Sequence, residues 1–262
     1  MDVSSVKIGF IGFGNMASAM ADGWIASGKV APKSLCACAG RYEALVPRCD
    51  ARGMRALPDA VAVVEASDVV VVAVKPYMIE CVLAPLAEAL MGKFVLSVAA
   101  GWDCEAYERV IPGTRHLSTV PNTPVAINEG VIACEKTSTL TDDDYELVYA
   151  LLGLLGRAVE VETRLLPVAG TVGGCSPAFI AMVIEALADA AVKHGISRAT
   201  AYEMVSQMVA GTAKLQMATG MHPGAMKDAV CSPGGTTIRG VAELEASGMR
   251  SAFIRAIDAI EG

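Results

Sequence analysis

The sequence is poor in the residues that build metal sites and disulfide frameworks. It has only three histidines, and its eight cysteines include no Cys-x-x-Cys pair: Cys36 and Cys38 are one residue apart, and the others stand singly. This spacing favours neither a zinc site nor a disulfide-stabilised fold. We therefore expect no metal, and free buried thiols in a reducing compartment.

The sequence also lacks a clear membrane span, a secretory signal and an excess of basic residues. The most promising apolar window, residues 175–192, is interrupted by Pro177, Glu185 and Asp189, so we expect no membrane-spanning helix. Residues 1–7 carry acid as well as base, and no small-residue cleavage site follows them. The net charge of −7 provides no basic field for nucleic acid. These absences predict a cytoplasmic protein whose partner is a small molecule.

Apolar residues, in contrast, are abundant. They make up 53% of the 262 residues, compared with roughly 45–50% in an average soluble chain. Without a membrane span, the excess indicates a subunit interface as apolar as a domain core. The chain is also longer than most single domains, which predicts two domains.

The first predicted domain, residues 1–162, has the pattern of a parallel sheet covered by helices, because short β-branched runs alternate with amphipathic stretches. Residues 68–74 are nearly all apolar, as in a strand buried on both faces. Thr141 and the three aspartates after it predict a helix that runs to about Leu155, where Gly156 lets it stop. The predicted strands are Val6–Ile11, Leu35–Ala39, Asp68–Val74, Phe94–Ala99, His116–Val120, Val131–Cys134 and Ala158–Val161.

The second predicted domain, residues 163–262, has no strand signals. Apolar residues at three- and four-residue spacing predict helices over Ala178–His194, Arg198–Ala218 and Thr237–Ile260, the last of them broken near Gly248. A segment of about 100 residues with such wide apolar faces makes a poor independent core, so we expect it to interleave with a second copy. The predicted fold class is α/β: a Rossmann-like doubly wound sheet followed by an all-α dimerisation domain.

A glycine-rich loop follows the first predicted strand. Gly12 allows a tight turn, Gly14 lets a pyrophosphate approach the backbone, and the small Ala17 seats the next helix on the sheet. This G-x-G-x-x-A motif lies between a strand and a helix, which predicts dinucleotide binding. The alternative is a tight turn without a ligand.

The ends of the later strands indicate the type of dinucleotide. The second strand ends near Ala39 without the carboxylate that binds the ribose hydroxyls of NAD. Arg41 follows and could pair with the 2′-phosphate of NADP, or it could merely open the next helix on the surface. Lys75 ends the third strand, either in the crevice or as a solvated surface lysine. We expect NADPH as the cofactor, with NADH as the alternative. The predicted cofactor residues are Gly12, Gly14, Asn15, Met16, Ala39, Arg41, Val74, Lys75, Pro76, Ala99 and Ala100.

A second dense motif lies near the end of the chain, in residues 227–237. Pro233 fixes one backbone dihedral, Gly234 and Gly235 free the next ones, and Thr236 and Thr237 open an apolar helix. Such a loop exposes backbone amides at a helix N-terminus, which suits a carboxylate or a phosphate. Taken alone, it could equally be an elaborate helix cap.

The whole chain resembles the pyrroline-5-carboxylate reductase family in the order and spacing of its motifs. They are Gly9–Met16 (GFIGFGNM), Ala73–Pro76 (AVKP), Ser97–Gly101 (SVAAG), Pro121–Pro124 (PNTP), Glu185–Val192 (EALADAAV), His222–Pro223 (HP) and Met226–Ile238 (MKDAVCSPGGTTI). The resemblance implies reduction of L-1-pyrroline-5-carboxylate to L-proline by hydride transfer, the last step of proline biosynthesis. It also implies a homodimer, or a larger homo-oligomer built on dimers.

Carried over residue by residue, the resemblance implies that the amides of Gly234–Thr237 hold the substrate carboxylate. The Thr237 hydroxyl would bind the ring nitrogen as the catalytic contact, and Ser232 would support the loop. One stretch departs from the family: Thr171, Gly173 and Phe179 stand where a glycine, a serine and a tyrosine are usual. No hydroxyl contact is therefore predicted there.

Two other functions remain open at this point. A β-hydroxyacid dehydrogenase would share the nucleotide domain, but it would carry a catalytic lysine on the long helix, and the first lysine here is Lys193 at the far end of that helix. A non-catalytic NADPH sensor would bind the nucleotide without turnover. Oxidation of NADPH in the presence of pyrroline-5-carboxylate would distinguish the reductase from such a sensor.

Overall fold

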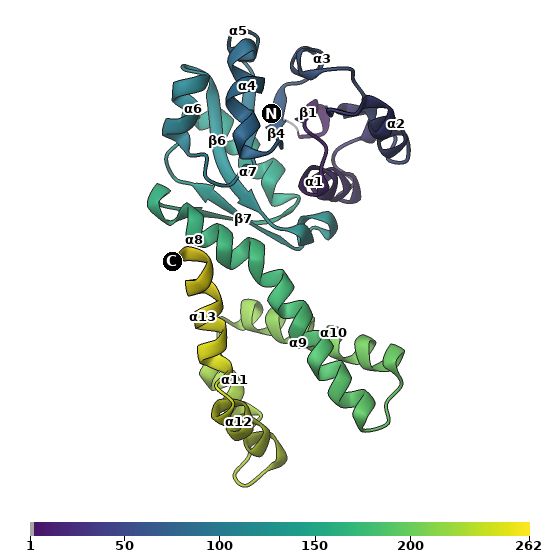
Figure 1. The fold of residues 1–262 in the computed structure, drawn as a ribbon, viewed down its shortest axis with the longest axis vertical. Helices are drawn as coiled ribbons and strands as arrows, with labels where there is room; N and C mark the ends of the chain where they lie inside the picture. The colour runs from purple at the N-terminus through teal and green to yellow at the C-terminus, as the bar shows by residue number, and fades with distance from the viewer. Residues whose placement is uncertain (1–2) are drawn as a thin grey trace. The chain divides into compact units, whose positions relative to one another are not determined.

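The structure is a computed structural model that describes residues 3–262. It divides into two compact units, the first ending at Cys175 and the second spanning Ser176–Gly262. Figure 1 shows the strands in the first unit and the long helices in the second. The sequence places the domain boundary at 162/163, whereas packing divides the chain at 175/176.

The first unit is built on one eight-stranded sheet of order β3-β2-β1-β4-β5-β6-β7-β8. Its strands are β1 (Ile8–Ile11), β2 (Leu35–Cys38), β3 (Arg55–Ala56), β4 (Val69–Val72), β5 (Phe94–Ser97), β6 (Arg115–Pro121), β7 (Gly130–Glu135) and β8 (Gly156–Val161). Each predicted strand is present. The sequence missed β3, because two residues at a sheet edge are too short to show a period. The neighbours of β1 are β2 and β4, so the chain order reverses there and leaves a crevice at the carboxyl ends of these strands.

One part of the sheet is not parallel. Strands β3 to β6 pair in parallel and so do β7 and β8, but β7 runs antiparallel to β6. The connection between β6 and β7 contains only the short 3-10 turn Thr123–Ile127. A parallel crossover needs a dozen or more residues, so this connection can only reverse the chain. The sheet is therefore mostly parallel, as predicted, with one antiparallel pair at β6 and β7.

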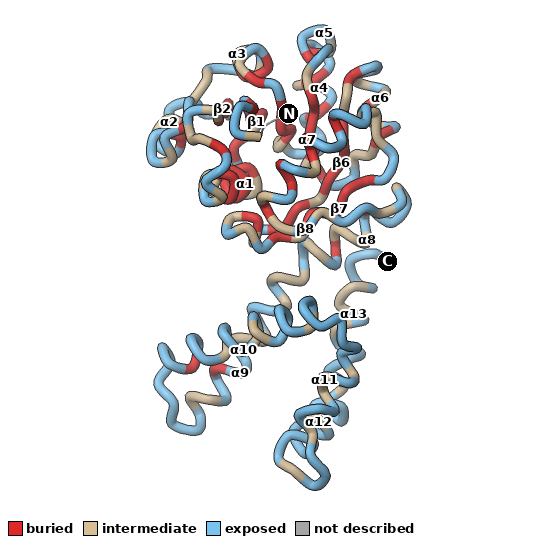
Figure 2. The backbone as a smooth tube through the Cα atoms, turned by 180° about the vertical axis from the view of Figure 1, so that it is seen from behind, coloured by how far each residue is buried: buried red, intermediate tan, exposed pale blue. Residues whose placement is uncertain are grey.

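Helices cover both faces of the sheet. The helices of the first unit are α1 (Asn15–Ala26), α2 (Tyr42–Asp50), α3 (Ala60–Ala66), α4 (Ile79–Leu83), α5 (Ala87–Leu90), α6 (Cys104–Val110), α7 (Asp142–Gly153) and α8 (Leu166–Gly170). Helices α1, α2 and α7 pack with Phe10 and Val71 on one face, and α3 to α6 pack with Ile11 and Val72 on the other. Alternate residues of the same strands thus point into two cores, which is why their sequences are apolar throughout. Figure 2 shows these strands as buried.

Helix α7 begins as predicted. The Thr141 hydroxyl accepts a hydrogen bond from the Asp144 amide, and the Asp144 carboxylate accepts one from the Thr141 amide, which makes a capping box. The helix ends at Gly153, two residues before the predicted end. Gly156 does not terminate it; instead it opens β8 in the backbone conformation φ +143°.

The segment after residue 162 packs on the sheet of the first unit. Thr163 donates a hydrogen bond to Glu135 Oε1 (2.7 Å), and Asn122 Nδ2 donates to the Gly173 carbonyl (3.0 Å). A Cβ at Gly173 would lie 3.1 Å from Val131 Cγ1, so at this departure from the family the backbone carbonyl, and not a side chain, makes the contact. These contacts explain why packing divides the chain later than sequence composition does.

The helical stretch Thr163–Lys193 is long and apolar enough to cross a membrane by length and composition alone, with a mean hydropathy of 1.7 over its best window. This differs from the expectation drawn from residues 175–192. Residues 165–184 carry no charge, and Pro177, which was expected to interrupt the apolar window, lies within the helix. The helix instead continues through a π-helical turn at Thr171–Cys175.

The second unit is all helical. It contains α9 (Ser176–Lys193), α10 (Arg198–Thr219), α11 (Pro223–Ala229), α12 (Thr236–Ala246) and α13 (Met249–Glu261). The predicted helices are confirmed, including the break at Gly248, and Ser197 caps α10; α11 was not predicted. Within the described residues of this unit only Ala188 and Ala201 are buried. Its apolar helix faces are therefore largely exposed in the single chain, as Figure 2 shows.

Candidate cofactor and substrate sites

A cavity of about 820 Å³ lies in the first unit at the carboxyl ends of β1, β2, β4 and β5. All the cofactor residues predicted from the sequence line it: Gly12, Gly14, Asn15, Met16, Ala39, Arg41, Val74, Lys75, Pro76, Ala99 and Ala100. Arg48, Met78 and Thr123 also line it, and the sequence reasoning missed them. This is the crevice where ligands bind in doubly wound sheets.

The two glycines of the nucleotide loop have different local geometries. Gly12 has φ +91°, and a Cβ there would lie 2.7 Å from the Ala73 carbonyl oxygen. Gly14 has φ −84°, and no heavy atom lies within 4 Å of the position that its Cβ would take. Gly12 therefore serves the turn, and Gly14 leaves open space beside the cavity.

The start of α1 can accept an anion. Its N-cap is Gly14, and among residues 3–262 no side-chain cap hydrogen bond is present. Uncapped amides at a helix N-terminus carry partial positive charge and bind phosphates. The space beside Gly14 and these amides fit the pyrophosphate of a dinucleotide.

Two cations line the same cavity and have no side-chain partner among residues 3–262. Arg41 is the N-cap residue of α2, and Lys75 directly precedes the 3-10 turn Pro76–Met78. Neither side chain forms a hydrogen bond or an ion pair with any residue in the described range 3–262. Arg41 thus both opens a helix and lies on the cavity wall, so the two interpretations of this residue are compatible. Free guanidinium and ammonium groups at this position suit an anionic ligand.

A buried hydrogen-bond network supports the cavity wall at the end of β5. The Tyr107 hydroxyl on α6 donates to Ser97 Oγ (2.7 Å), which accepts a further hydrogen bond from the Ala99 amide (3.2 Å). Thr119 Oγ1 donates to the Ser97 carbonyl (2.6 Å). Burial raises the pKa of Tyr107 far above its usual range, which keeps the hydroxyl a proton donor. Sequence reasoning missed Tyr107, because nothing in an amphipathic helix marks a tyrosine that reaches a neighbouring strand.

The loop before α12 lies in the second unit and leaves helix amides free. Gly235 is the N-cap of α12, and no side chain caps the helix. The Gly235 amide donates to the Ser232 carbonyl (3.0 Å), and a Cβ at Gly235 would lie 2.4 Å from Ser232 Oγ. Glycine is itself a common N-cap residue, so the loop remains compatible with both a simple cap and an anion site. Ser232 lies beside Gly235 in this loop.

Thr236 and Thr237 begin α12, and both are exposed. Over the part of the chain that the structure describes, neither hydroxyl has a hydrogen-bond partner within the protein. Both hydroxyls are therefore available to a ligand.

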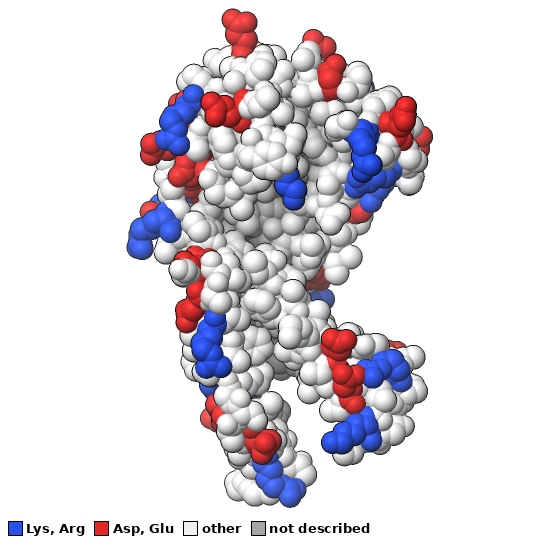
Figure 3. Space-filling model, viewed as in Figure 1, with Lys and Arg blue, Asp and Glu red and all other residues white. Residues whose placement is uncertain are grey.

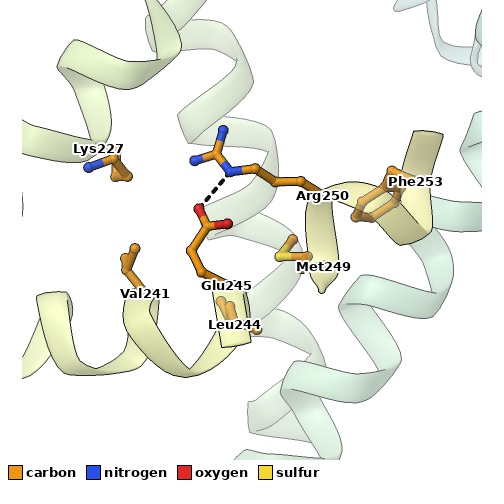
Figure 4. A pocket seen from close by; sticks show the side chains of 7 residues that line it. All are labelled: Lys227, Val241, Leu244, Glu245, Met249, Arg250 and Phe253. Atoms are coloured by element: carbon orange, nitrogen blue, oxygen red, sulfur yellow. Dashed lines mark hydrogen bonds and ion pairs between the residues drawn. The ribbon is translucent and has the colours of Figure 1, made fainter. Parts of the chain in front are cut away.

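Two apolar hollows also lie in the second unit. One, of about 230 Å³, is drawn in Figure 4: Arg250 Nε pairs with Glu245 Oε1 (2.6 Å) there, among the side chains of Lys227, Val241, Leu244, Met249 and Phe253. The other, of about 520 Å³, lies between α9 and α13 and is lined by apolar residues including Phe179. Phe179 thus occupies an apolar environment, where a hydroxyl is not needed. None of the predicted substrate residues lines either hollow.

The cysteines are free, as expected, but not all are buried. Cys36, Cys38, Cys49, Cys104 and Cys134 are buried, whereas Cys81 and Cys175 are exposed. Burial raises the pKa of Cys104 to about 11, which keeps its thiol protonated.

Charges of both signs are interspersed over the face shown in Figure 3.

Comparison with known families gives two matches within the chain. Residues 163–261 match the family described as pyrroline-5-carboxylate reductase dimerisation, and residues 7–101 match the family described as NADP oxidoreductase coenzyme F420-dependent. The second match contains the glycine-rich loop and most of the residues that line the cavity.

Known proteins match over nearly the full length. The pyrroline-5-carboxylate reductase of Treponema pallidum is 40% identical over 259 residues, which cover 97% of this chain and 98% of that protein. The enzyme of the same name from Escherichia coli is 40% identical over 254 residues, covering 96% and 94%. The crystal structure of Plasmodium falciparum pyrroline carboxylate reductase with NADP bound is 25% identical, with a TM-score of 0.87, and covers 98% of this chain and 96% of that one.

Proposed function

Because this chain belongs to the pyrroline-5-carboxylate reductase family, we propose that it reduces L-1-pyrroline-5-carboxylate to L-proline with NADPH, in the last step of proline biosynthesis. The observation that carries the proposal is the 40% identity to a reductase of that name over 97% of the chain. The uncapped loop before α12 supports it, because the substrate carries a carboxylate that such a loop can hold.

The cavity of the first unit is the proposed cofactor site. The amides at the start of α1 would hold the pyrophosphate, Arg41 would pair with the 2′-phosphate, and Ala99 and Ala100 would lie against the nicotinamide ring. When bound, the reduced nicotinamide supplies the hydride. The free Arg41 side chain favours NADPH over NADH, since only NADPH carries a phosphate at that position.

The loop of residues 232–237 is the proposed substrate site. The amides of Gly234–Thr237 would fix the carboxylate, and the Thr237 hydroxyl would hydrogen-bond the ring nitrogen. The nitrogen can take its proton from water, so these residues need no strong acid. Their contribution is positioning: an imine carbon held about 3–3.5 Å from the hydride donor reacts far faster than a free one.

Replacement of Thr237 tests this assignment. Thr237→Ala should lower kcat/KM for pyrroline-5-carboxylate by about one to three decades, because a positioned hydrogen bond to the changing nitrogen is lost. Thr237→Ser should restore most of the activity, because it keeps the hydroxyl. Thr236→Ala is the matched control, since the proposal assigns Thr236 only a backbone contact. An unchanged kcat/KM in Thr237→Ala, measured by NADPH oxidation, would refute the catalytic role of Thr237.

The second unit is the proposed homodimer interface, with larger assemblies built on that dimer. Met182, Met204 and Met217 are 57–67% exposed, and only Ala188 and Ala201 are buried there. We further propose that a second copy, and not lipid or nucleic acid, covers these faces, and that the protein is cytoplasmic. A stable monomer at micromolar concentration in sedimentation experiments, or recovery only with detergent, would contradict this proposal.

A further inference from the structure

One arginine of α2 is attached to the nucleotide loop. Arg48 Nη1 donates to the carbonyl oxygen of Phe13 at 2.6 Å, and Nη2 donates to Ser18 Oγ at 2.7 Å. The guanidinium carbon also lies 5.1 Å from the centroid of the Phe13 ring. Arg48 lines the cofactor cavity. A single side chain from α2 therefore holds both the loop between β1 and α1 and the first part of α1.

The Phe13 carbonyl belongs to the peptide that joins Phe13 to Gly14. The rotation of this peptide is set by ψ of Phe13 and φ of Gly14, and a glycine restricts its own φ only weakly, so the orientation of the peptide is costly to fix. In a trans peptide the carbonyl and the following amide point in opposite directions. A hydrogen bond that directs the Phe13 carbonyl toward Arg48 therefore directs the Gly14 amide to the other side.

Arg48 is held by the protein through two hydrogen bonds, whereas the Arg41 side chain has no hydrogen-bond partner within residues 3–262. Both terminal nitrogens of Arg48 donate, one to Phe13 and one to Ser18, and its guanidinium lies near the Phe13 ring, so the group cannot turn toward a phosphate without losing these contacts. Arg41 lines the same cavity with no partner in residues 3–262. Of the two arginines that line this cavity, Arg48 is hydrogen-bonded to the nucleotide loop and Arg41 is available to a ligand.

From this difference we propose that Arg48 is a positioning residue: it pre-organises the glycine-rich loop for the pyrophosphate and does not bind the 2′-phosphate. The proposal rests on the proposed dinucleotide binding. If so, the contribution of Arg48 to binding is the same for NADPH and for NADH, because both cofactors contain the pyrophosphate. Loss of Arg48 weakens both cofactors by the same factor, whereas loss of Arg41 weakens NADPH alone.

The test is a titration of the full-length protein with NADPH and with NADH, in which nicotinamide fluorescence gives the Kd. Arg48→Gln should raise both Kd values by the same factor, about 10- to 100-fold, since hydrogen bonds from a charged donor are lost. Arg48→Lys keeps the charge but cannot reach both acceptors with the same fork, so it should recover only part of the affinity. Ser18→Ala removes one of the two contacts and should show a smaller effect of the same kind. Arg41→Gln should raise the Kd of NADPH only.

Arg52→Gln is the matched control for folding. Arg52 lies 5.8 Å from the same Phe13 ring and pairs with Asp22 (2.6 Å), but it does not line the cavity. Its loss should leave both Kd values at the wild-type level. A rise in the NADPH Kd alone for Arg48→Gln, unchanged Kd values, or full recovery in Arg48→Lys would each overturn the proposal. If the wild type binds neither nucleotide, the proposed function itself fails, which is a separate outcome.

Discussion

Replacement by alanine should have different effects at the two glycines of the nucleotide loop: at Gly12 it should lower the stability of the fold, and at Gly14 it should lower the affinity for NADPH. Gly12→Ala should destabilise the fold. Its φ of +91° costs an alanine about 1–2 kcal/mol. Its new Cβ would also lie 2.7 Å from the Ala73 carbonyl oxygen and 3.0 Å from Val74 Cγ1. The backbone at Ala73 cannot move without disturbing the pairing of β1 with β4, so overpacking adds about 1–3 kcal/mol. The expected loss in unfolding free energy is about 2–5 kcal/mol.

Gly14→Ala should leave stability nearly unchanged. The backbone there, with φ −84° and ψ −160°, is open to any residue, and no heavy atom lies within 4 Å of the new Cβ. An alanine at the N-cap costs less than about 1 kcal/mol relative to glycine. The methyl group would instead take up the open space beside the cofactor cavity, where a pyrophosphate must approach the backbone. We expect the Kd for NADPH to rise by about 10-fold or more, a change of at least about 1.4 kcal/mol.

Urea unfolding without nucleotide measures the first effect, and titration of nicotinamide fluorescence measures the second. All variants are compared at one protomer concentration, since the stability of a homo-oligomer depends on it. The reasoning fails if Gly14→Ala unfolds as easily as Gly12→Ala, or if Gly14→Ala binds NADPH as tightly as the wild type.

Two further predictions follow from the hydrogen bonds of single side chains. Tyr107→Phe removes the donor to Ser97 Oγ and should lower the unfolding free energy by about 1–2 kcal/mol. It should also raise the KM for NADPH, because Ser97 Oγ, the acceptor for the Ala99 amide, is no longer held in place by Tyr107; a wild-type urea midpoint would contradict this account. Hydrogen bonds from Tyr145 and Tyr149 hold the pKa of Glu160 below its usual value. The stabilisation is therefore fully present above the unfolded pKa of about 4.3 and lost as pH falls through the lower folded pKa. The unfolding free energies of the wild type and of Tyr145→Phe/Tyr149→Phe should thus converge in acid, and a difference that stays constant from pH 7 to pH 3 would refute the link.

The sequence predicts the strands of the first unit because a strand buried on both faces must be apolar at every position. Val69–Val72 shows this directly, with alternate residues in two different cores. Strand direction is not encoded in that pattern. The antiparallel β7 follows from the length of the connection at Thr123–Ile127, which residue periodicity does not report.

The cofactor residues were predictable for a related reason. Carboxyl ends of adjacent parallel strands meet at one edge of the sheet, so residues that follow separate strands, such as Arg41, Lys75 and Ala99, line one cavity. Arg48 and Tyr107 could not be found this way. Each acts from a helix toward a different element, and which face of that helix meets the loop or the strand is decided by tertiary packing alone.

The apolar excess of the composition has its physical explanation in the second unit. The core of the first unit is complete within the chain, whereas the helices of the second bury only Ala188 and Ala201. The helical stretch Thr163–Lys193, which includes α9, is long enough and apolar enough to suit either a membrane or a protein partner. Its exposed residues Glu185 and Asp189, and the Arg198–Asp189 ion pair with α10, are costly in a hydrocarbon layer and ordinary at the polar rim of a protein interface. The same helices that would suit a membrane by composition are therefore better matched to a second copy of this chain.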